Sequence, residues 1–444
     1  MPELIRKKKK MSSFEMIAFG FAGVILLGAI ILMLPISSSA GVVTPFDKTL
    51  FTATSAVCVT GLVVVDTGSY WSAFGQAVIL LLIQTGGLGV ITVVASFSMV
   101  SGRKISLMQR STMQDAISAP KVGGIVRLTK FILQGTFLIE LIGAILMLPV
   151  FCRDYGWKGI WMSVFHSVSA FCNAGFDLFG IKEPFSSLTF YHSNIYLNII
   201  IMLLIITGGI GFLVWGDIGT HKHRIRRYSL QSKVVLMTSA VLIVLPALYF
   251  FFFEYDHGTI HDRTIHSLFQ SVTTRTAGFN TTDLAAMDES GTAIMVILML
   301  IGGSPGSTAG GMKTATFAVL FLSAITVFSR RNDVQCFKRR ISDETVRSAG
   351  AVLFMYLVLF FTSGVIISRV EDLPLLTCLF ETSSAIGTVG LSLGITSGLS
   401  AVSRVILMIL MFFGRVGGLT LIYAALPSAD SQNSRLPLEK ISVG

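Results

Sequence analysis

One short phrase occurs four times in this chain, at intervals of about a quarter of its length. Each copy begins with Phe, continues through small and hydroxyl residues, and ends in Gly followed by Leu or Phe. The copies read FTATSAVCVTGL (51–62), FHSVSAFCNAGF (165–176), FQSVTTRTAGF (269–279) and FETSSAIGTVGL (380–391). A repeat of this kind predicts four copies of one structural unit around which the whole fold is organised.

The composition places these units in a membrane, since 52% of the residues are hydrophobic and only 13% are charged. Ordinary soluble domains carry about 25% charged residues. Eight apolar segments, each near or above the ~20 residues that cross a bilayer as helix, form four pairs. The pairs are 13–35 with 73–100, 128–150 with 195–216, 233–253 with 292–328, and 349–368 with 402–426. Each phrase lies between the two members of a pair, so each unit is a span, a re-entrant segment and a second span.

The expected fold is therefore an all-α membrane protein with four parallel span–pore loop–span repeats around a central pseudo-fourfold pore. It would contain eight transmembrane helices and four re-entrant pore loops. The chain divides into a cytoplasmic tail (1–12), repeats 1 to 4 (13–101, 102–219, 220–330, 331–427) and a second cytoplasmic tail (428–444).

Each phrase predicts a short helix (46–56, 160–170, 265–273 or 375–385) that gives way to extended backbone ending at glycine. Irregular backbone at membrane depth is tolerated where protein buries it or where it lines a water-filled cavity. Four such segments around one axis would offer rings of carbonyl oxygens, as in potassium-selective filters. Glycine suits this role because it adopts backbone angles that align successive carbonyls. The alternative is four glycine-ended extracellular turns.

The net charge of +10 is a topology signal. Basic residues gather in 6–10, 103–130, 222–233, 330–347 and the C-terminal tail, whereas acidic residues gather in the alternate loops. Basic loops mark the cytoplasmic side, so both termini are expected inside the cell. No nucleic-acid partner is expected. The basic loops could contact anionic lipids or a cytosolic partner.

The motifs CVTGL, CNAGF, RTAGFN and AIGTVGL, with GGSPGSTAGGMKT at 302–314, resemble the Trk/Ktr/HKT superfamily of potassium transporters, specifically the membrane subunit of Ktr systems. The resemblance implies potassium as the transported ion at a filter of backbone carbonyls. In this family a serine at the first filter glycine accompanies sodium transport, so Gly61 implies potassium selectivity. The implied filter residues are Val59, Thr60, Gly61, Asn173, Ala174, Gly175, Thr276, Ala277, Gly278, Thr388, Val389 and Gly390.

The resemblance also implies partners: a second copy of the chain, and a cytosolic KtrA/KtrC-like ring of Rossmann-type subunits that binds ATP or ADP. The chain itself shows neither a Walker motif nor a GxGxxG motif opening a βαβ unit. No cofactor is therefore expected in this chain, and nucleotide would act only through the partner. A role for sodium as activator stays open, and a bacterial cell membrane is the expected location.

The glycines and proline of 302–311 cannot remain regular helix without a heavy cost, so the third repeat's second span should break into a loop. In the family such a loop is the gate. The implied gate residues are Gly302, Gly303, Ser304, Pro305, Gly306, Ser307, Thr308, Ala309, Gly310, Gly311 and Lys313. The corresponding motifs GGLG, GGIG and GRVGG of the other repeats favour close helix packing through small residues.

Charges at mid-membrane depth cost at least about 2.5–3.5 kcal/mol when unpaired. Arg415 therefore has two interpretations: a positive barrier beside the pore, as the family implies, or a buried ion pair with Glu140. Glu140 itself is expected to be structural.

Three rival functions can be weighed. An intramembrane enzyme would need a motif such as HExxH or paired aspartates, and the sequence has neither of these in its spans. Organic-solute transporters usually show inverted repeats, whereas these repeats are parallel. A simple potassium or non-selective cation channel without a regulatory partner remains the alternative.

Overall fold

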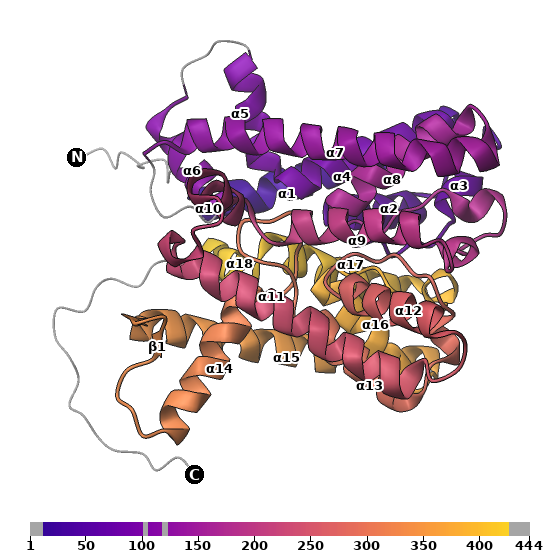
Figure 1. Cartoon of the computed structure of the whole chain (residues 1–444). Coiled ribbons are helices and arrows are strands. Elements are labelled where there is room, and N and C mark those ends of the chain that lie inside the picture. The colour runs from indigo at the N-terminus through magenta and orange to yellow at the C-terminus, as the bar shows by residue number, and fades with distance from the viewer. Residues whose placement is uncertain (1–11, 101–104, 118–122, 426–444) are drawn as a thin grey trace, which may run out of the picture.

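The computed structural model describes residues 12–100, 105–117 and 123–425, which form a largely helical molecule (Figure 1). Four long helices match the first predicted span of each pair. They are α1 (Ser13–Met33), α7 (Ile125–Tyr155), α11 (Leu230–Tyr249) with the π-helical turn η5 (Phe250–Glu254), and α15 (Asp343–Glu371). Each is long and apolar enough to cross a membrane.

Side-chain caps fix where several of these helices begin. The Ser12 hydroxyl accepts a hydrogen bond from the Glu15 amide, and the Glu15 carboxylate accepts one from the Ser12 amide, which completes a capping box at α1. Ser229 and Ser342 accept bonds from the third amide of α11 and α15 in the same way. A serine ahead of an apolar run therefore sets the start of α1, α11 and α15, whereas α7 begins after Gly124 without a side-chain cap.

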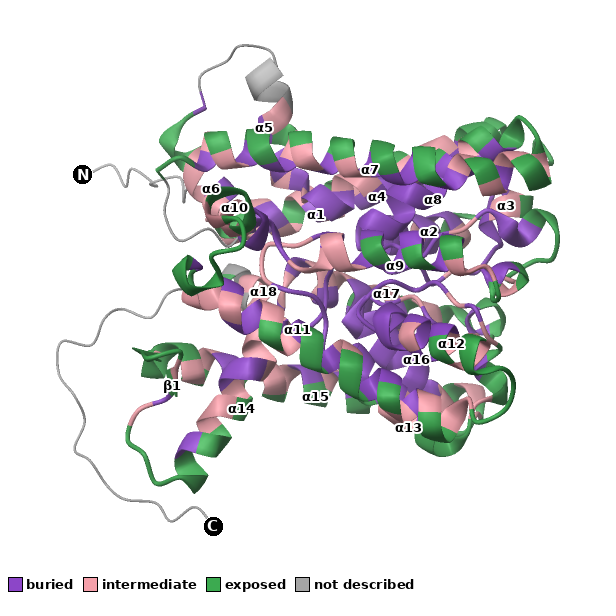
Figure 2. Ribbon diagram, viewed as in Figure 1, coloured by how far each residue is buried: buried purple, intermediate pink, exposed green. Residues whose placement is uncertain are grey.

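Four shorter helices occupy the middle of the molecule. They are α2 (Phe46–Val57), α8 (Lys158–Phe171), α12 (Ile260–Thr273) and α16 (Leu375–Gly387). Figure 2 shows that these helices are largely buried, whereas the long helices carry exposed residues on their outer faces. The first Phe of every phrase is among the largest fully buried side chains: Phe51, Phe165, Phe269 and Phe380. The repeated aromatic therefore anchors each pore helix in the core.

All four second spans are broken into two helices. The pairs are α4 (Ala73–Leu88) with α5 (Val90–Val100), α9 (Ile195–Gly209) with α10 (Phe212–His221), α13 (Glu289–Leu300) with α14 (Thr314–Phe328), and α17 (Ala401–Val416) with α18 (Gly418–Ala425). The first two pairs bend by 98° and 96°. The interruption predicted in the third repeat is present as the loop between α13 and α14.

The expectation of uninterrupted helices in the other three repeats is wrong. Gly89, Gly211 and Gly417 have φ of +85°, +96° and +92°, which a regular helix cannot contain. The predicted close packing is nevertheless present one turn earlier, where the first glycine of each motif lies against the end of a pore helix. A Cβ on Gly86 or Gly208 would collide with the Val57 or Phe171 carbonyl. One motif therefore combines a packing glycine and a bending glycine.

The remaining elements are short. They are the helices α3 (Thr67–Tyr70) and α6 (Leu107–Ile117), the 3-10 turns η1 (Pro35–Ser37), η2 (Phe179–Ile181), η3 (Thr189–Tyr191), η4 (Ile225–Arg227), η6 (Leu284–Ala286) and η7 (Thr396–Gly398), and the strands β1 (Gln335–Cys336) and β2 (Arg339–Arg340). The two strands pair antiparallel, with Gln335 opposite Arg340.

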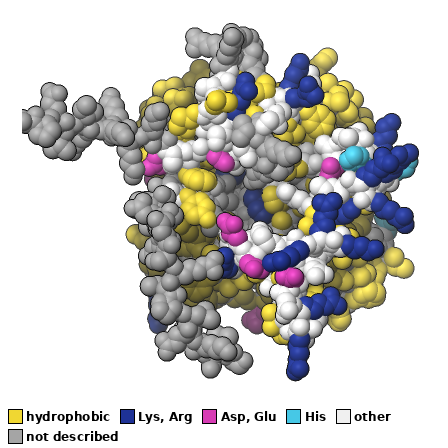
Figure 3. Space-filling model, turned by 90° about the vertical axis from the view of Figure 1, so that its left-hand side faces the viewer, with side chains coloured by type: hydrophobic (Ala, Val, Ile, Leu, Met, Phe, Trp, Pro, Cys, Tyr) yellow, Lys and Arg dark blue, Asp and Glu magenta, His cyan; other side chains and the backbone are white. Residues whose placement is uncertain are grey.

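The outer surface of the long helices is apolar. On α7, Phe137, Leu138 and Leu141 are 57–58% exposed. An exposed apolar surface of this extent marks contact with a membrane, so the chain is a multi-pass membrane protein. The end of the molecule that carries α10 and the β1–β2 hairpin differs, because Lys and Arg side chains gather there (Figure 3).

Candidate ion pore

The four phrase-ending glycines form a closed ring. A Cβ added to Gly61 would lie 3.3 Å from the Cα of Gly175, and one on Gly175 would lie 2.8 Å from the Cα of Gly278. From Gly278 the corresponding distance to the Cα of Gly390 is 3.3 Å, and from Gly390 it returns to Gly61 at 3.0 Å. Segments that are about a quarter of the chain apart therefore meet around one axis in sequence order.

Carbonyl oxygens lie within this ring. The residue before each glycine places its carbonyl against the neighbouring glycine: Ala174 against Gly61, Ala277 against Gly175, Val389 against Gly278, and Thr60 against Gly390. All four glycines have positive φ, between +68° and +95°. These backbone angles explain why glycine occupies all four positions.

The residue two positions before each glycine is also left-handed, which the sequence does not suggest. Val59, Asn173, Thr276 and Thr388 have φ of +54°, +58°, +63° and +50°. Three of the four are β-branched, and for such residues a positive φ is a genuine outlier. Strain of this kind persists where the surroundings enforce it, typically at functional sites.

Hydroxyl groups at the fifth position of each phrase hold this strained backbone. Ser55 and Ser384 accept hydrogen bonds from the amides of Gly61 and Gly390, both at 3.0 Å. Ser169 and Thr273 instead donate to the carbonyls of Phe176 and Phe279. The hydroxyl-rich phrases alone do not predict this role; the recurrence of Ser or Thr at the fifth position is the signal in the sequence that points to it.

In repeats 2 and 4, the residue at the second position of the phrase holds the segment that follows the glycine. The buried His166 accepts a bond from the Leu178 amide at 3.2 Å. In the fourth repeat the buried Glu381 accepts bonds from Ser392, Leu393 and Thr396. In these two repeats the polar residue after the first Phe thus positions the segment beyond the ring.

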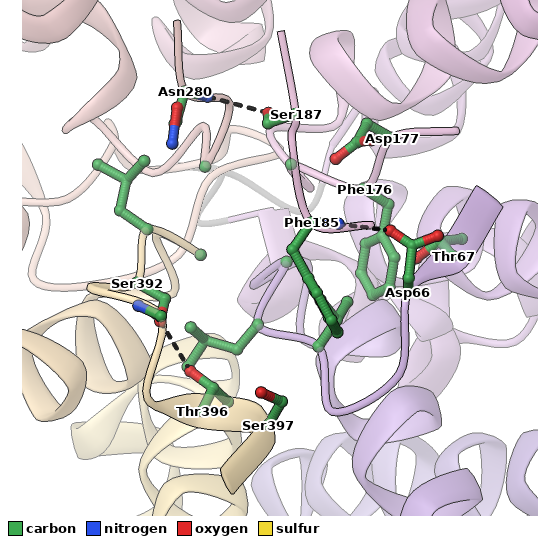
Figure 4. Close-up of a pocket in the computed structure, with 18 of the residues that line it drawn as sticks. Asp66, Thr67, Phe176, Asp177, Phe185, Ser187, Asn280, Ser392, Thr396 and Ser397 are labelled. Atoms are coloured by element: carbon green, nitrogen blue, oxygen red, sulfur yellow. Dashed lines mark hydrogen bonds between the residues drawn. The ribbon is translucent and has the colours of Figure 1, made fainter. Parts of the chain in front are cut away.

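A cavity of 170 Å³ opens above the ring, and all four glycines line it (Figure 4). The residues two positions after the glycines, Val63, Asp177, Asn280 and Ser392, line its wall. Asp177 lies in the loop outside the spanning helices. Burial raises the pKa of Asp177 to about 7; a bond from the Phe179 amide opposes this rise, and the nearby charge of Asp66 adds to it.

The loop between α13 and α14 crosses directly below the ring. The Gly302 amide donates to the Met312 carbonyl at 2.7 Å, so the two ends of the loop are joined. The amides of Ser304 and Thr308 donate to the carbonyls of Gly209 and Gly208 in the second repeat. On the other side, the Gly311 amide donates to the Gly414 carbonyl at 3.0 Å. The predicted gate residues therefore bridge repeats 2 and 4.

The Arg415 guanidinium fixes this loop. Nη1 donates to the Thr308 carbonyl, and Nη2 donates to the carbonyls of Gly86 and, at 2.9 Å, Gly87. One side chain of the fourth repeat thus joins the loop of the third to the broken span of the first. Lys313 turns back on its own loop and donates to the Ala309 carbonyl at 2.8 Å.

The alternative ion pair between Arg415 and Glu140 is wrong. The Glu140 carboxylate accepts a bond from the Gln84 amide at 3.2 Å and lies 3.9 Å from Cys172 Sγ. The guanidinium is instead satisfied by carbonyl oxygens, which carry partial negative charge and suit a planar, multi-donor group. The Glu140 carboxylate of repeat 2 instead bonds to Gln84 of repeat 1.

The family model described as "TrkH: Cation transport protein" matches residues 24–434. The chain belongs to this family of cation transport proteins. It is 38% identical to the potassium/sodium uptake protein NtpJ of Enterococcus hirae over 99% of both chains. It is also 38% identical to the Ktr system potassium uptake protein B of Bacillus subtilis, over 97% of this chain and 96% of the relative. These relatives are ion-uptake proteins and not enzymes.

The fold agrees with a solved member of the TrkH family. The crystal structure of the potassium transporter TrkH from Vibrio parahaemolyticus superimposes with a TM-score of 0.74. The alignment covers 96% of this chain and 86% of that one at 17% identity. This likeness establishes the fold of the chain.

A second cavity, of 290 Å³, lies on the far side of the loop in this TrkH-family chain. Gly306, Ser307, Lys313 and Arg415 are among its lining residues. The ring and the loop thus stand between an outer and an inner cavity. Within the described residues, no group of three or more His, Cys, Asp or Glu side chains could hold a metal ion.

Proposed function

We propose that this chain takes up potassium across the cell membrane through a filter of backbone carbonyls. The observation that carries the proposal is the closed ring of Gly61, Gly175, Gly278 and Gly390, with a carbonyl of one repeat against each glycine of the next. Carbonyl oxygens replace the hydration shell of a potassium ion. The predicted filter residues of all four repeats contribute to this ring or precede it directly.

Passage through the filter is controlled by the 302–313 loop and Arg415. The loop is bonded to repeats 2 and 4, and Arg415 extends the contacts to repeat 1. Because these bonds hold the loop to the three other repeats, the loop would stay in the ion path and keep the pore closed. Two effects would then limit flux: the loop obstructs the path, and the guanidinium repels cations by a few kcal/mol at an effective dielectric constant of ~20.

The chain would work as the membrane subunit of a Ktr-type system, as a dimer, with a cytosolic ring of nucleotide-binding subunits. Support comes from the relatives named as Ktr system potassium uptake proteins. The basic end of the molecule (Figure 3) offers a surface for such a ring or for anionic lipid. A pore that runs without a regulatory subunit is the second candidate.

The direct test is potassium uptake by cells that lack their own potassium uptake systems and express this chain, with and without sodium. Growth and potassium uptake at low external potassium are expected. A change in the rate of potassium uptake on adding sodium decides whether sodium activates the transport of potassium. Correctly inserted chain that supports uptake of sodium but not of potassium would contradict the proposal. Nucleotide dependence conferred by a co-expressed cytosolic ring would exclude the partner-free pore.

A further inference from the structure

Asn173 differs from the residues that share its position in the ring. Val59, Thr276 and Thr388 occupy the same left-handed position in the other repeats and are all β-branched. Asn173 alone of the four carries a side-chain amide, and it is fully buried. Its left-handed backbone is the conformation that Asn adopts more readily than other non-glycine residues.

The Asn173 amide group reaches the filter segment of the third repeat. Its Nδ2 donates to the Arg275 carbonyl at 3.2 Å and lies 3.4 Å from the Thr276 hydroxyl. Both acceptors belong to the adjacent segment of the glycine ring. Two neighbouring filter segments are therefore joined by a side chain as well as by the contact of their glycines.

The same amide also faces the gate loop. The Thr308 hydroxyl lies 3.4 Å from Asn173 Oδ1 and donates to the Phe171 carbonyl at 3.0 Å. The glycine pair of the second repeat leaves room for this arrangement, because a Cβ on Gly208 would lie 3.0 Å from Oδ1 and one on Gly209 would lie 3.4 Å from Nδ2. The Asn173 side chain thus occupies the space that these two glycines leave open.

We propose that Asn173 is a specificity-determining positioning residue, whose amide fixes the spacing of the second and third filter segments. Its contact with Thr308 belongs to the closed loop and contributes to closure. The proposal rests on the filter function proposed above and adds an asymmetry to it: one of the four ring junctions has a polar side-chain link. Ion selectivity depends on this link, whereas the Thr308 contact affects only how readily the loop leaves the path.

The test compares potassium and sodium uptake by proteoliposomes containing the purified full-length chain. Asn173→Thr places in repeat 2 the residue that repeats 3 and 4 already hold in this conformation, but it is too short to link the segments. The potassium-to-sodium ratio should fall by roughly 2- to 10-fold, the range that one net hydrogen bond corresponds to. Asn173→Gly adopts the same φ without strain and should lower the ratio in the same direction.

Two controls separate the alternatives. Asn198→Thr makes the same change at a fully buried asparagine outside the ring, whose amide donates to the Tyr191 and His192 carbonyls, and should leave the ratio unchanged. Thr308→Val removes the gate contact but keeps both bonds to repeat 3, so uptake of both ions should rise together at a constant ratio.

An unchanged ratio in both Asn173 variants would overturn the proposal, as would an equal fall in Asn198→Thr or Thr308→Val. Wild-type chain without a preference for potassium would instead refute the filter function itself.

Discussion

At the scale of single residues, the site separates into what the sequence predicts and what it cannot. Glycine at the end of each phrase predicts positive φ, and all four glycines have it. The left-handed Val59, Thr276 and Thr388 could not be predicted, because local preference opposes that conformation and only the packed surroundings enforce it. The partners of Arg415 could not be predicted either. Every residue has a backbone carbonyl, so the sequence does not show which carbonyls of another repeat lie near the guanidinium.

Replacing Arg415 with Ala should raise potassium uptake by roughly tenfold or more, because each hydrogen bond from a charged donor contributes about 1.5–3 kcal/mol. The uptake rate of Arg415→Lys should lie between those of wild type and Arg415→Ala, because a single ammonium cannot reproduce the planar guanidinium that joins Thr308 to Gly86 and Gly87. Initial rates of uptake into proteoliposomes measure the effect. Glu140→Gln is the matched control and should leave the rate unchanged. Equal rates for wild type and Arg415→Ala, at equal amounts of inserted protein, would remove Arg415 from the gate.

Asp177 should make uptake depend on external pH. Its pKa of about 7 means that the carboxylate is charged above pH 7 and neutral below it. A negative charge in the outer cavity attracts cations, so uptake at low potassium concentration should fall as the external pH drops through 7. Asp177→Asn should show the lower rate at every pH, with this step removed. A step of the same size in the Asn variant would assign the pH dependence to another group.

At the scale of elements, the pattern of apolar segments located the spans but not their interruptions. The first spans contain no glycine motif that breaks them, so length and hydropathy suffice to predict them. In the second spans, GGLG, GGIG and GRVGG predict close packing, and the packing exists. The bends at Gly89, Gly211 and Gly417 could not be predicted, because glycine is compatible with both a helical and a positive φ.

Deleting Pro305–Gly310 should raise potassium uptake and make it less dependent on a cytosolic partner. The deletion removes the Thr308 carbonyl that Arg415 binds and the Gly306 carbonyl that accepts a bond from the Phe212 amide at 2.7 Å. Uptake with and without the partner, at matched protein levels, is the measurement. Unchanged or lower uptake by normally folded protein would refute the assignment of this loop as the gate.

At the scale of the whole molecule, the fourfold repeat was the strongest signal in the sequence. Parallel repeats with one re-entrant segment each predicted that the four phrases meet at one axis, and the glycine ring shows this meeting. The repeats are not equivalent in detail: Asn173 links only the second and third segments, the gate loop belongs to the third repeat, and Arg415 belongs to the fourth. These asymmetries could not be predicted, because each depends on contacts between repeats rather than on any repeat alone.

The most direct measurement of the central claim is the relative uptake of potassium and sodium by wild-type chain and by Gly61→Ser. Gly61 has φ of +95°, and a Cβ there would lie 2.5 Å from the Ala174 carbonyl oxygen. Strain of about 1–3 kcal/mol at such a position should displace that carbonyl and lower the potassium-to-sodium ratio by roughly tenfold. An unchanged ratio in correctly inserted Gly61→Ser protein would contradict the account of one filter shared by four repeats.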